Sequence, residues 1–258
     1  MELWTKEHAM VILPVFALEL ILAIVFARLF KNKSEKVRLI PILVIGIILL
    51  VLEVFKQIIW GYGDGSGYTL YALPFHFCSL FIFIYVLTYF IRGKYQENMR
   101  IFTTVCGAML LLIMLVYPNL IFSSGDVTNY FKEFISFHTV TFHLLASFAF
   151  MLMISLNLYT INIRRDLLTL LLGFTIFAII SASMANILKT NYASFYFMQV
   201  EPIDTIRQSL VNSIGVFGQI LYDVVVWLVD VVVAYLCYFS ILGIRKLTLL
   251  IIDKIKSK

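Results

Sequence analysis

Long apolar runs recur along the whole chain and are separated by short polar segments. Seven of these runs are close to the ~20 residues that a helix needs to cross a ~30 Å hydrocarbon core. No stretch shows the alternation of apolar and polar residues that is typical of strands. The predicted helices cover Ala9–Phe30, Leu39–Trp60, Leu73–Ile91, Ile101–Pro118, Phe134–Tyr159, Leu167–Ile187 and Ile220–Gly243. The segment Ser209–Gln219 is apolar enough for a short interfacial or re-entrant helix.

Composition agrees with this pattern. Of the 258 residues, 62% are hydrophobic and only 14% are charged, which is more apolar surface than a soluble domain of this length can bury. The gaps between the predicted helices leave no room for a separate soluble domain. We therefore predict an all-α, polytopic transmembrane helix bundle of about seven helices, with residues 1–258 as a single domain.

The basic residues are divided unevenly between the two sets of loops. Lys and Arg are enriched in cytoplasmic loops of membrane proteins, so this bias predicts the N-terminus outside and the C-terminus in the cytoplasm of a cell membrane. It also accounts for the net charge of +5 without a nucleic-acid partner. One set of loops holds Arg28, Lys31, Lys33, Lys36, Arg38, Arg92, Lys94, Arg100, Arg164, Arg165, Arg245, Lys246, Lys254, Lys256 and Lys258. The other set holds only Lys6, Lys132, Lys189 and Arg207.

With this orientation, most polar residues within the helices lie in the outer half of the membrane, where five helices contribute them; Glu19 and Asp230 lie deeper. Ionisable residues inside a membrane usually face the bundle interior or a water-filled cavity. A network that only holds the helices together is one interpretation, and a shared pocket that opens outward is the other, which we favour. The residues concerned are Glu53, Lys56, His76, Cys78, Ser79, His138, Thr139, Thr141, His143, Ser181, Ser183, Asn186 and Asp223.

Cys78 is the candidate nucleophile of this pocket. Cys106 and Cys237 lie in the inner halves of their helices, too far from Cys78 for a disulfide, so its thiol stays unpaired among histidines. In a helix, His76 would lie about 200° around from Cys78 and would serve poorly as its base. A base is therefore expected from the fifth helix.

The fifth helix offers two histidines, His138 and His143, which lie about 140° apart around it. Asp223 or Glu53 could orient the imidazole that serves as base, as the third member of a catalytic triad does. We expect Glu53 and Lys56, spaced i, i+3, to form an ion pair.

Two further features are polar and are predicted near the outer face. The glycine-rich stretch Gly61–Gly67 could let backbone amides approach a phosphate, although it lacks the strand, helix and lysine of a P-loop and is read first as a flexible turn. Asn191 and Tyr192 follow the sixth predicted helix. A metal site would need His76, His138, His143 and Asp223 to converge, and the sequence holds no short metalloprotease-type pair of ligands, so we predict no metal and no cofactor.

Four stretches carry a resemblance to a known family. LPFHFCSL at Leu73–Leu80, with its His-x-Cys pair, resembles the hallmark of bacterial YwaF-type integral membrane proteins. The family has a vertebrate relative, a transmembrane acyltransferase that places polyunsaturated chains on ether phospholipids. The stretches Cys106–Leu120, Ser136–Phe148 and Asn186–Tyr192 resemble further segments of the family in the same order. The similarity covers about residues 40–245.

The resemblance implies a membrane-embedded lipid acyltransferase in which Cys78 carries the acyl chain as a thioester and His143 assists, with His138 as its rival. Related lipid hydrolases pair a threonine with a histidine instead. The expected partner is a membrane phospholipid or another acyl lipid, with Glu53, Lys56, His76, Asn191 and Tyr192 as candidate contacts. The alternative is a protein that binds or transports a small solute in the same pocket, with Glu53, Lys56 and Asp223 as ligand or proton sites.

Overall fold

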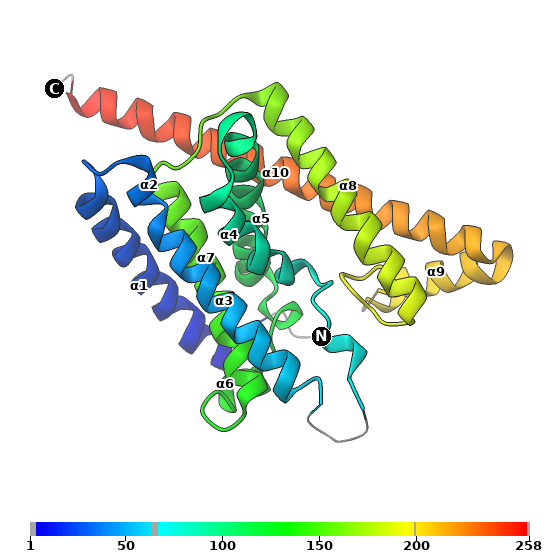
Figure 1. Ribbon diagram of the computed structural model, residues 1–258. Helices are drawn as coiled ribbons and strands as arrows, with labels where there is room; N and C mark the ends of the chain where they lie inside the picture. Colours follow the sequence, from blue (N-terminus) through cyan, green and yellow to red (C-terminus); the bar gives the residue numbers. More distant parts are fainter. Residues whose placement is uncertain (1–3, 63–66, 199, 257–258) are drawn as a thin grey trace.

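The computed structural model describes residues 4–62, 67–198 and 200–256, and the regular elements within these ranges are all helical (Figure 1). In chain order they are α1 (Lys6–Phe30), α2 (Glu35–Arg38), α3 (Ile40–Ile59), η1 (Leu70–Ala72), η2 (Phe77–Ser79), α4 (Leu80–Phe90), η3 (Gly93–Tyr95), α5 (Gln96–Val116), η4 (Pro118–Leu120), α6 (Ser124–Thr128), α7 (Phe134–Ser155), α8 (Ile163–Leu188), α9 (Glu201–Ile214) and α10 (Val216–Lys256).

Six helical segments in the described part of the chain are long and apolar enough to cross a membrane, which confirms an all-α, multi-pass architecture. The orientation of the termini and the exact number of crossings stay predictions. The six segments are Lys6–Phe30, Glu35–Ile59, Gly93–Val116, Phe134–Ser155, Ile163–Leu188 and Val216–Thr248.

The third predicted helix, Leu73–Ile91, differs from the expectation. Only Leu80–Phe90 is α-helical, and the residues before it form two short 3₁₀ turns joined by extended backbone. Pro74 explains the break, because proline lacks an N–H donor and disfavours helical backbone at the residue before it. Leu73 is accordingly extended, with φ −59° and ψ 145°, and His76 likewise, with φ −75° and ψ 156°. The angle expected between His76 and Cys78 on one helix therefore does not apply.

The segment before the last helix also differs. A short helix was expected over Ser209–Gln219, but α9 occupies Glu201–Ile214 and ends at Gly215, whose φ of +59° suits glycine. The chain then turns into α10, which packs against α9 and α8 and is much longer than the predicted Ile220–Gly243.

Close packing of helices fixes the bundle around its centre. Figure 1 shows α3, α4, α5 and α7 side by side, with α1 outside them and with α8 and α10 on the other flank. Gly107 brings α5 against α7 so closely that a Cβ atom there would lie 2.6 Å from the Cβ of Phe150. This contact matters for the site because α5 and α7 both contribute residues to it.

We expect Gly107→Ala to destabilise the protein by roughly 1–3 kcal/mol, because the added methyl group meets a Cβ atom that cannot rotate away. Gly243→Ala is the matched control, since a Cβ there has no heavy atom within 4 Å. Thermal unfolding in detergent measures both variants. Equal midpoints for Gly107→Ala and the wild type would contradict the close packing of α5 on α7.

Candidate functional site

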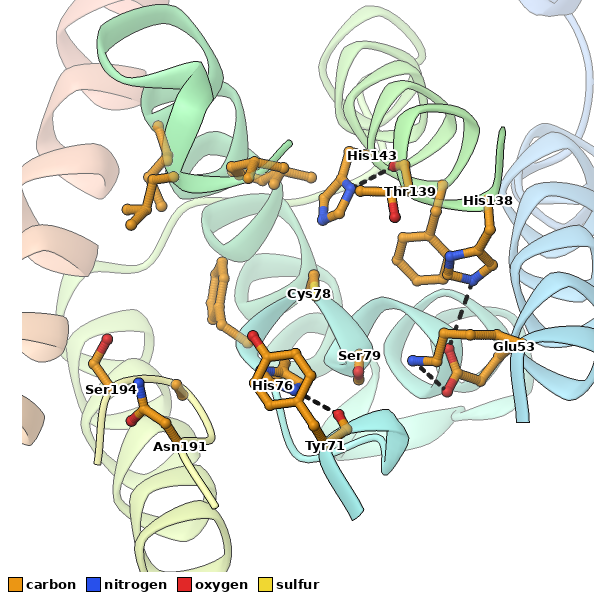
Figure 2. A pocket seen from close by; sticks show the side chains of 18 of the residues that line it. Glu53, Tyr71, His76, Cys78, Ser79, His138, Thr139, His143, Asn191 and Ser194 are labelled. Carbon is orange, nitrogen blue, oxygen red and sulfur yellow. Dashed lines mark hydrogen bonds and ion pairs between the residues drawn. The ribbon is translucent and has the colours of Figure 1, made fainter. Parts of the chain in front are cut away.

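A cavity of about 340 Å³ lies at the end of the bundle where α3 ends and α7 begins. Its wall is formed by α3, α5, η4, α7 and α10 and by the chain segments before α4 and after α8 (Figure 2). One part of the lining is polar, with Glu53, Lys56, Trp60, Tyr71, His76, Cys78, Ser79, His138, Thr139, His143, Asn191, Ser194 and Asp230. The apolar part includes Phe77, Met109, Leu110, Ile113, Leu120, Ile121 and Phe142.

The broken segment before α4 carries His76 and Cys78, and side chains from other elements hold it in place. Gln57 Nε2 of α3 donates to the carbonyl of Ala72 at 2.6 Å, and Ser181 Oγ of α8 donates to the carbonyl of Phe75 at 2.9 Å. Tyr192 donates its hydroxyl proton to the carbonyl of Leu70. Backbone groups that leave a helix in an apolar setting need such partners.

Cys78 lies in η2, immediately before the first turn of α4, and is half-buried with a free thiol. In the view of Figure 2 it lies on the cavity wall between His143 and His76. Among the described residues, no hydrogen bond joins Cys78 Sγ to a histidine nitrogen. Direct proton transfer therefore needs a rotation of one side chain or a bridging water.

The protonation of His143 follows from its partner. Its Nδ1 lies 2.6 Å from the backbone carbonyl of Thr139, and a carbonyl can only accept a hydrogen bond. Nδ1 therefore carries the proton, which leaves Nε2 of the neutral ring as an acceptor. His143 is buried and lines the cavity, so it has the form that a general base requires.

His138 lies beside the charged pair of α3. Glu53 pairs with Lys56 at 2.8 Å, which confirms the predicted ion pair, and it also accepts from Gln57 Nε2 at 2.5 Å. The other carboxylate oxygen of Glu53 lies 3.8 Å from His138 Nε2, which is buried and makes no hydrogen bond. The Glu53 carboxylate thus lies beside His138, although among the described residues no hydrogen bond joins the two.

His76 has the opposite tautomer to His143 and packs between aromatic rings. Its Nε2 donates to the Tyr71 carbonyl at 3.1 Å, so Nδ1 is the unprotonated nitrogen. The His76 ring packs edge-on against Tyr71 and Tyr192, with ring centroids 4.5 and 5.2 Å apart. Burial raises the pKa of the Tyr71 phenol, so that this hydroxyl stays protonated and can donate into the cavity.

Six of the residues predicted for the pocket do not line the cavity, namely Thr141, Ser181, Ser183, Asn186, Tyr192 and Asp223. Asp223 accepts hydrogen bonds from Asn186 at 2.9 Å and Gln219 at 3.0 Å, and joins α8 to α10. Tyr192 is fully buried and supports the broken segment from behind. Asn191 does line the cavity, but its side-chain oxygen accepts from the backbone N–H groups of residues 196 and 197.

Asp230 was not among the predicted site residues, although it was noted as a deep acidic residue. It lines the cavity from α10, and in the part of the chain that the structure describes no hydrogen bond or ion pair reaches its carboxyl group. The sequence gives the depth of Asp230 along its helix. It does not show which helices pack beside α10, and so it could not place this carboxyl group in the cavity. Of the stretch Gly61–Gly67, residues 63–66 lie outside the described residues.

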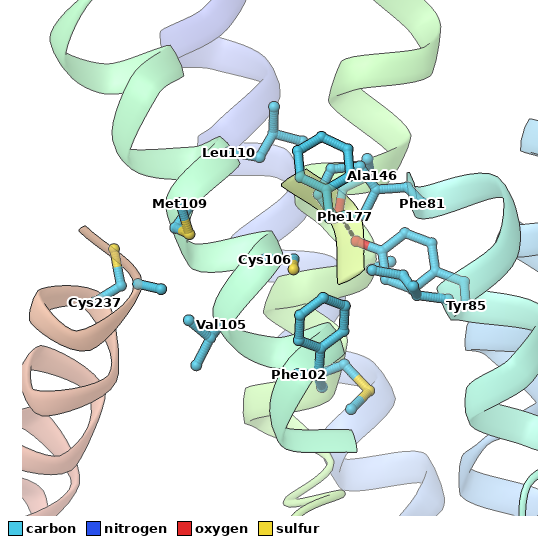
Figure 3. Packing of buried hydrophobic residues seen from close by; sticks show 14 of the residues in the cluster. Phe81, Tyr85, Phe102, Val105, Cys106, Met109, Leu110, Ala146, Phe177 and Cys237 are labelled. Atoms are coloured by element: carbon cyan, nitrogen blue, oxygen red, sulfur yellow. Dashed lines mark hydrogen bonds between the residues drawn. The ribbon is translucent and has the colours of Figure 1, made fainter. Parts of the chain in front are cut away.

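Cys106 and Cys237 are buried and free. Figure 3 shows Cys106 among apolar side chains of the core, close to Phe81, Tyr85 and Ala146, and Cys237 on α10 away from it. Both lie outside the cavity. Among the described residues, no three His, Cys, Asp or Glu side chains are grouped closely enough to hold a metal ion.

Comparison of the sequence with known proteins identifies its family. The model of the TMEM164 family matches residues 3–242, which include all the residues that line the cavity. The chain belongs to the TMEM164 family. No curated protein and no solved structure matches it. For this TMEM164-family protein, the match supports a multi-pass membrane protein.

In this TMEM164-family chain, the pair of Glu53 and Lys56 is buried, with both side chains at least nine-tenths covered. Removing one partner of a buried pair strands the other charge and costs about 3–5 kcal/mol. We therefore expect Lys56→Met to destabilise the protein strongly and Glu53→Gln/Lys56→Met to recover part of that loss. The free energies of unfolding of the wild type, both single variants and the double variant complete a double-mutant cycle. Additive losses would show that the two charges are not coupled.

Proposed function

We propose that the protein is a membrane-embedded, acyltransferase-like enzyme of the cell membrane that acts on phospholipid acyl chains in an outward-facing pocket. The observation that carries the proposal is a single cavity that combines a free thiol, a neutral imidazole with an unprotonated Nε2 and an apolar floor. The resemblance of Leu73–Leu80 to the His-x-Cys segment of a lipid acyltransferase family supports the same chemistry.

In the first half-reaction, the Cys78 thiol gives its proton to His143 Nε2, and Sγ attacks the carbonyl carbon of a phospholipid ester. The ester C–O bond breaks, the acyl chain stays on Sγ as a thioester, and the imidazolium returns the proton to the departing lysolipid oxygen. In the second half-reaction, an acceptor hydroxyl gives its proton to His143 and its oxygen attacks the thioester carbonyl. The new ester leaves, and the Cys78 thiolate takes back the proton. With water as the acceptor, the same steps release a fatty acid.

The tetrahedral intermediates need donors for their oxyanion. The first N–H groups of a helix have no partner within the helix, and Cys78 lies in the 3₁₀ turn that leads into α4. The N–H of Cys78 itself and the hydroxyl of Ser79 are therefore the nearest candidates in the chain. Ser79 lines the same cavity.

The charged corner of the cavity, formed by Glu53 and Lys56, has a role in binding the lipid headgroup. The Lys56 ammonium group has three N–H donors, and among the described residues one of them is used, by Glu53. The others are free for an anionic group such as the phosphate of a lipid, for which lysine serves as a point charge. His138 Nε2 lies next to this corner without a partner.

The second candidate function is the binding or transport of a small solute, which the unpartnered Asp230 favours because a carboxyl group within a membrane often marks a solute or proton path. The two functions differ in their requirements. An enzyme loses its activity with Cys78→Ala, whereas a transporter tolerates this change and depends on Glu53, Lys56 and Asp230.

We expect the purified protein, incubated with a phospholipid extract, to gain a fatty-acyl adduct on Cys78 that hydroxylamine removes. Intact-protein and peptide mass spectrometry measure the adduct. Cys78→Ser should abolish the hydroxylamine-sensitive adduct, while Cys106→Ala and Cys237→Ala keep it, because neither of these residues lines the cavity. The proposal is refuted if the wild-type protein never carries the adduct, or if the hydroxylamine-sensitive adduct persists in Cys78→Ser.

The two histidines of α7 should differ. His143→Ala should slow thioester formation by roughly 10²–10⁴-fold, the contribution of a general base. His138→Ala should leave the rate at saturating lipid nearly unchanged and raise the lipid concentration needed for half-saturation, because His138 adjoins the charged corner. Rates measured against lipid concentration for both variants separate the two roles. The reverse outcome would exchange the assignments.

A further inference from the structure

A second hollow lies on the outside of the bundle, between α3 and α7. It has a volume of about 510 Å³ and is lined only by apolar residues, most of them on α3. The α3 residues Ile47, Val51 and Phe55 are about half exposed, and Phe134 and Phe137 of α7 close the other side. The complete lining is Ile47, Ile48, Val51, Leu52, Phe55, Ile59, Phe134 and Phe137.

The size and place of this groove fit one occupant. From Ile47 to Ile59 it follows twelve residue steps of α3, which is about 18 Å at ~1.5 Å per residue. One leaflet contributes about half of the ~30 Å hydrocarbon core. The groove therefore follows α3 over about the depth of one leaflet, on an exposed face of a segment that is long and apolar enough to span the membrane.

The groove and the cavity lie on opposite faces of the same two helices. On α3, Glu53 and Lys56 point into the cavity and Phe55 and Ile59 into the groove. On α7, His138 lines the cavity and its neighbour Phe137 lines the groove.

Ring contacts connect the groove to the cavity. The Phe134 ring packs against Phe55 at 6.5 Å and against His138 at 6.2 Å, and His138 lies 3.8 Å from Glu53. Chains of rings are held by packing alone, so Phe134 can move without breaking a hydrogen bond.

Charge complements the apolar groove at one end. At the groove end that Phe55, Ile59 and Phe134 form, the Phe134 ring contacts His138, and behind it the pair of Glu53 and Lys56 lies on the cavity side of α3. A molecule with a long apolar chain and an anionic group at one end matches both features. A phospholipid has this construction.

We propose that the groove between α3 and α7 binds one acyl chain of a membrane phospholipid, and that Phe134 is the gate through which the lipid passes from the bilayer into the cavity. The binding site stands on its own geometry, whereas the delivery of substrate through it rests on the proposed function. Val51 lies in the middle of the groove, so a larger side chain there fills it.

Photolabelling tests the groove without requiring catalysis. The full chain carrying Cys78→Ser is reconstituted in phosphatidylcholine vesicles that contain a phospholipid with a diazirine in one acyl chain. After irradiation, peptide mass spectrometry should find several-fold more adduct on residues 47–59 and 134–137 than around Ile21 of α1 and Ile179 of α8, which are apolar and even more exposed than Ile47, Val51 and Phe55. Val51→Trp should reduce the labelling of the groove several-fold, and the control Ile179→Trp should not. Uniform labelling of all exposed apolar positions would mean bulk lipid only and would overturn the proposal.

Thioester formation on Cys78, measured in protein that keeps this cysteine, then tests whether lipid reaches the cavity through the groove. If the groove is labelled and Val51→Trp slows formation of the thioester several-fold, the groove delivers lipid to the cavity. Labelling of the groove without any thioester supports the lipid site and refutes the proposed enzyme. A thioester that forms at the same rate in Val51→Trp refutes entry between α3 and α7 and does not contradict the proposed enzyme.

Phe134→Leu should speed thioester formation if the ring is the gate, and an unchanged rate would refute that role.

Discussion

A peptide segment that leaves a helix inside an apolar bundle must find a partner for each exposed carbonyl, and here four side chains supply them. Gln57, Ser181 and Tyr192 donate to the carbonyls of residues 72, 75 and 70, and His76 donates to its own segment at Tyr71. Because hydrocarbon offers no replacement, each lost donor would leave a carbonyl unsatisfied. These bonds hold the segment before Cys78, which Pro74 breaks and which is extended at Leu73 and His76, in its non-helical form.

The same bonds couple the site to the whole bundle. They tie the broken segment to α3, α8 and the loop after α8, while α4 is fixed to α7 by the Tyr85 hydroxyl, which donates to the Ala146 carbonyl at 2.7 Å. The distance between Cys78 on one side and His143 on the other is therefore set by helix packing, and not by a local motif. A broken helix that lines a cavity is a recurrent way to place reactive groups in a membrane, since the irregular backbone is tolerated only there.

Length and hydrophobicity were sufficient to predict the spans, because the cost of polar groups in hydrocarbon leaves few alternatives to a helix. Depth along each helix then brought Glu53, Lys56, His138 and His143 to one level, and all four line the cavity. Pro74 is a signal for the break that the prediction missed, because the apolar run around it favoured a continuous helix over Leu73–Ile91.

The misplaced residues depended on side-chain direction, which depth does not give. Asp223 lies at a suitable depth but turns toward Asn186 and Gln219, whereas Asp230 turns into the cavity. The tautomer of His143 depends on its side-chain conformation, which brings Nδ1 within 2.6 Å of the Thr139 carbonyl in its own helix. Such choices are decided by packing between helices that are far apart in the sequence.

The buried pair of Glu53 and Lys56 is the strongest argument that the cavity serves a ligand. Two charges taken out of water often lose more hydration energy than their attraction returns, and apolar residues of similar size often stabilise a buried site at least as well. Stability therefore gives no reason to keep the pair. Under the proposed function, the Lys56 cation, held by one carboxylate at the wall of the cavity, instead serves to bind an anion. Because Phe55 and Ile59 on the opposite face of the same helix turn meet the bilayer, that anion would most directly come attached to a lipid chain.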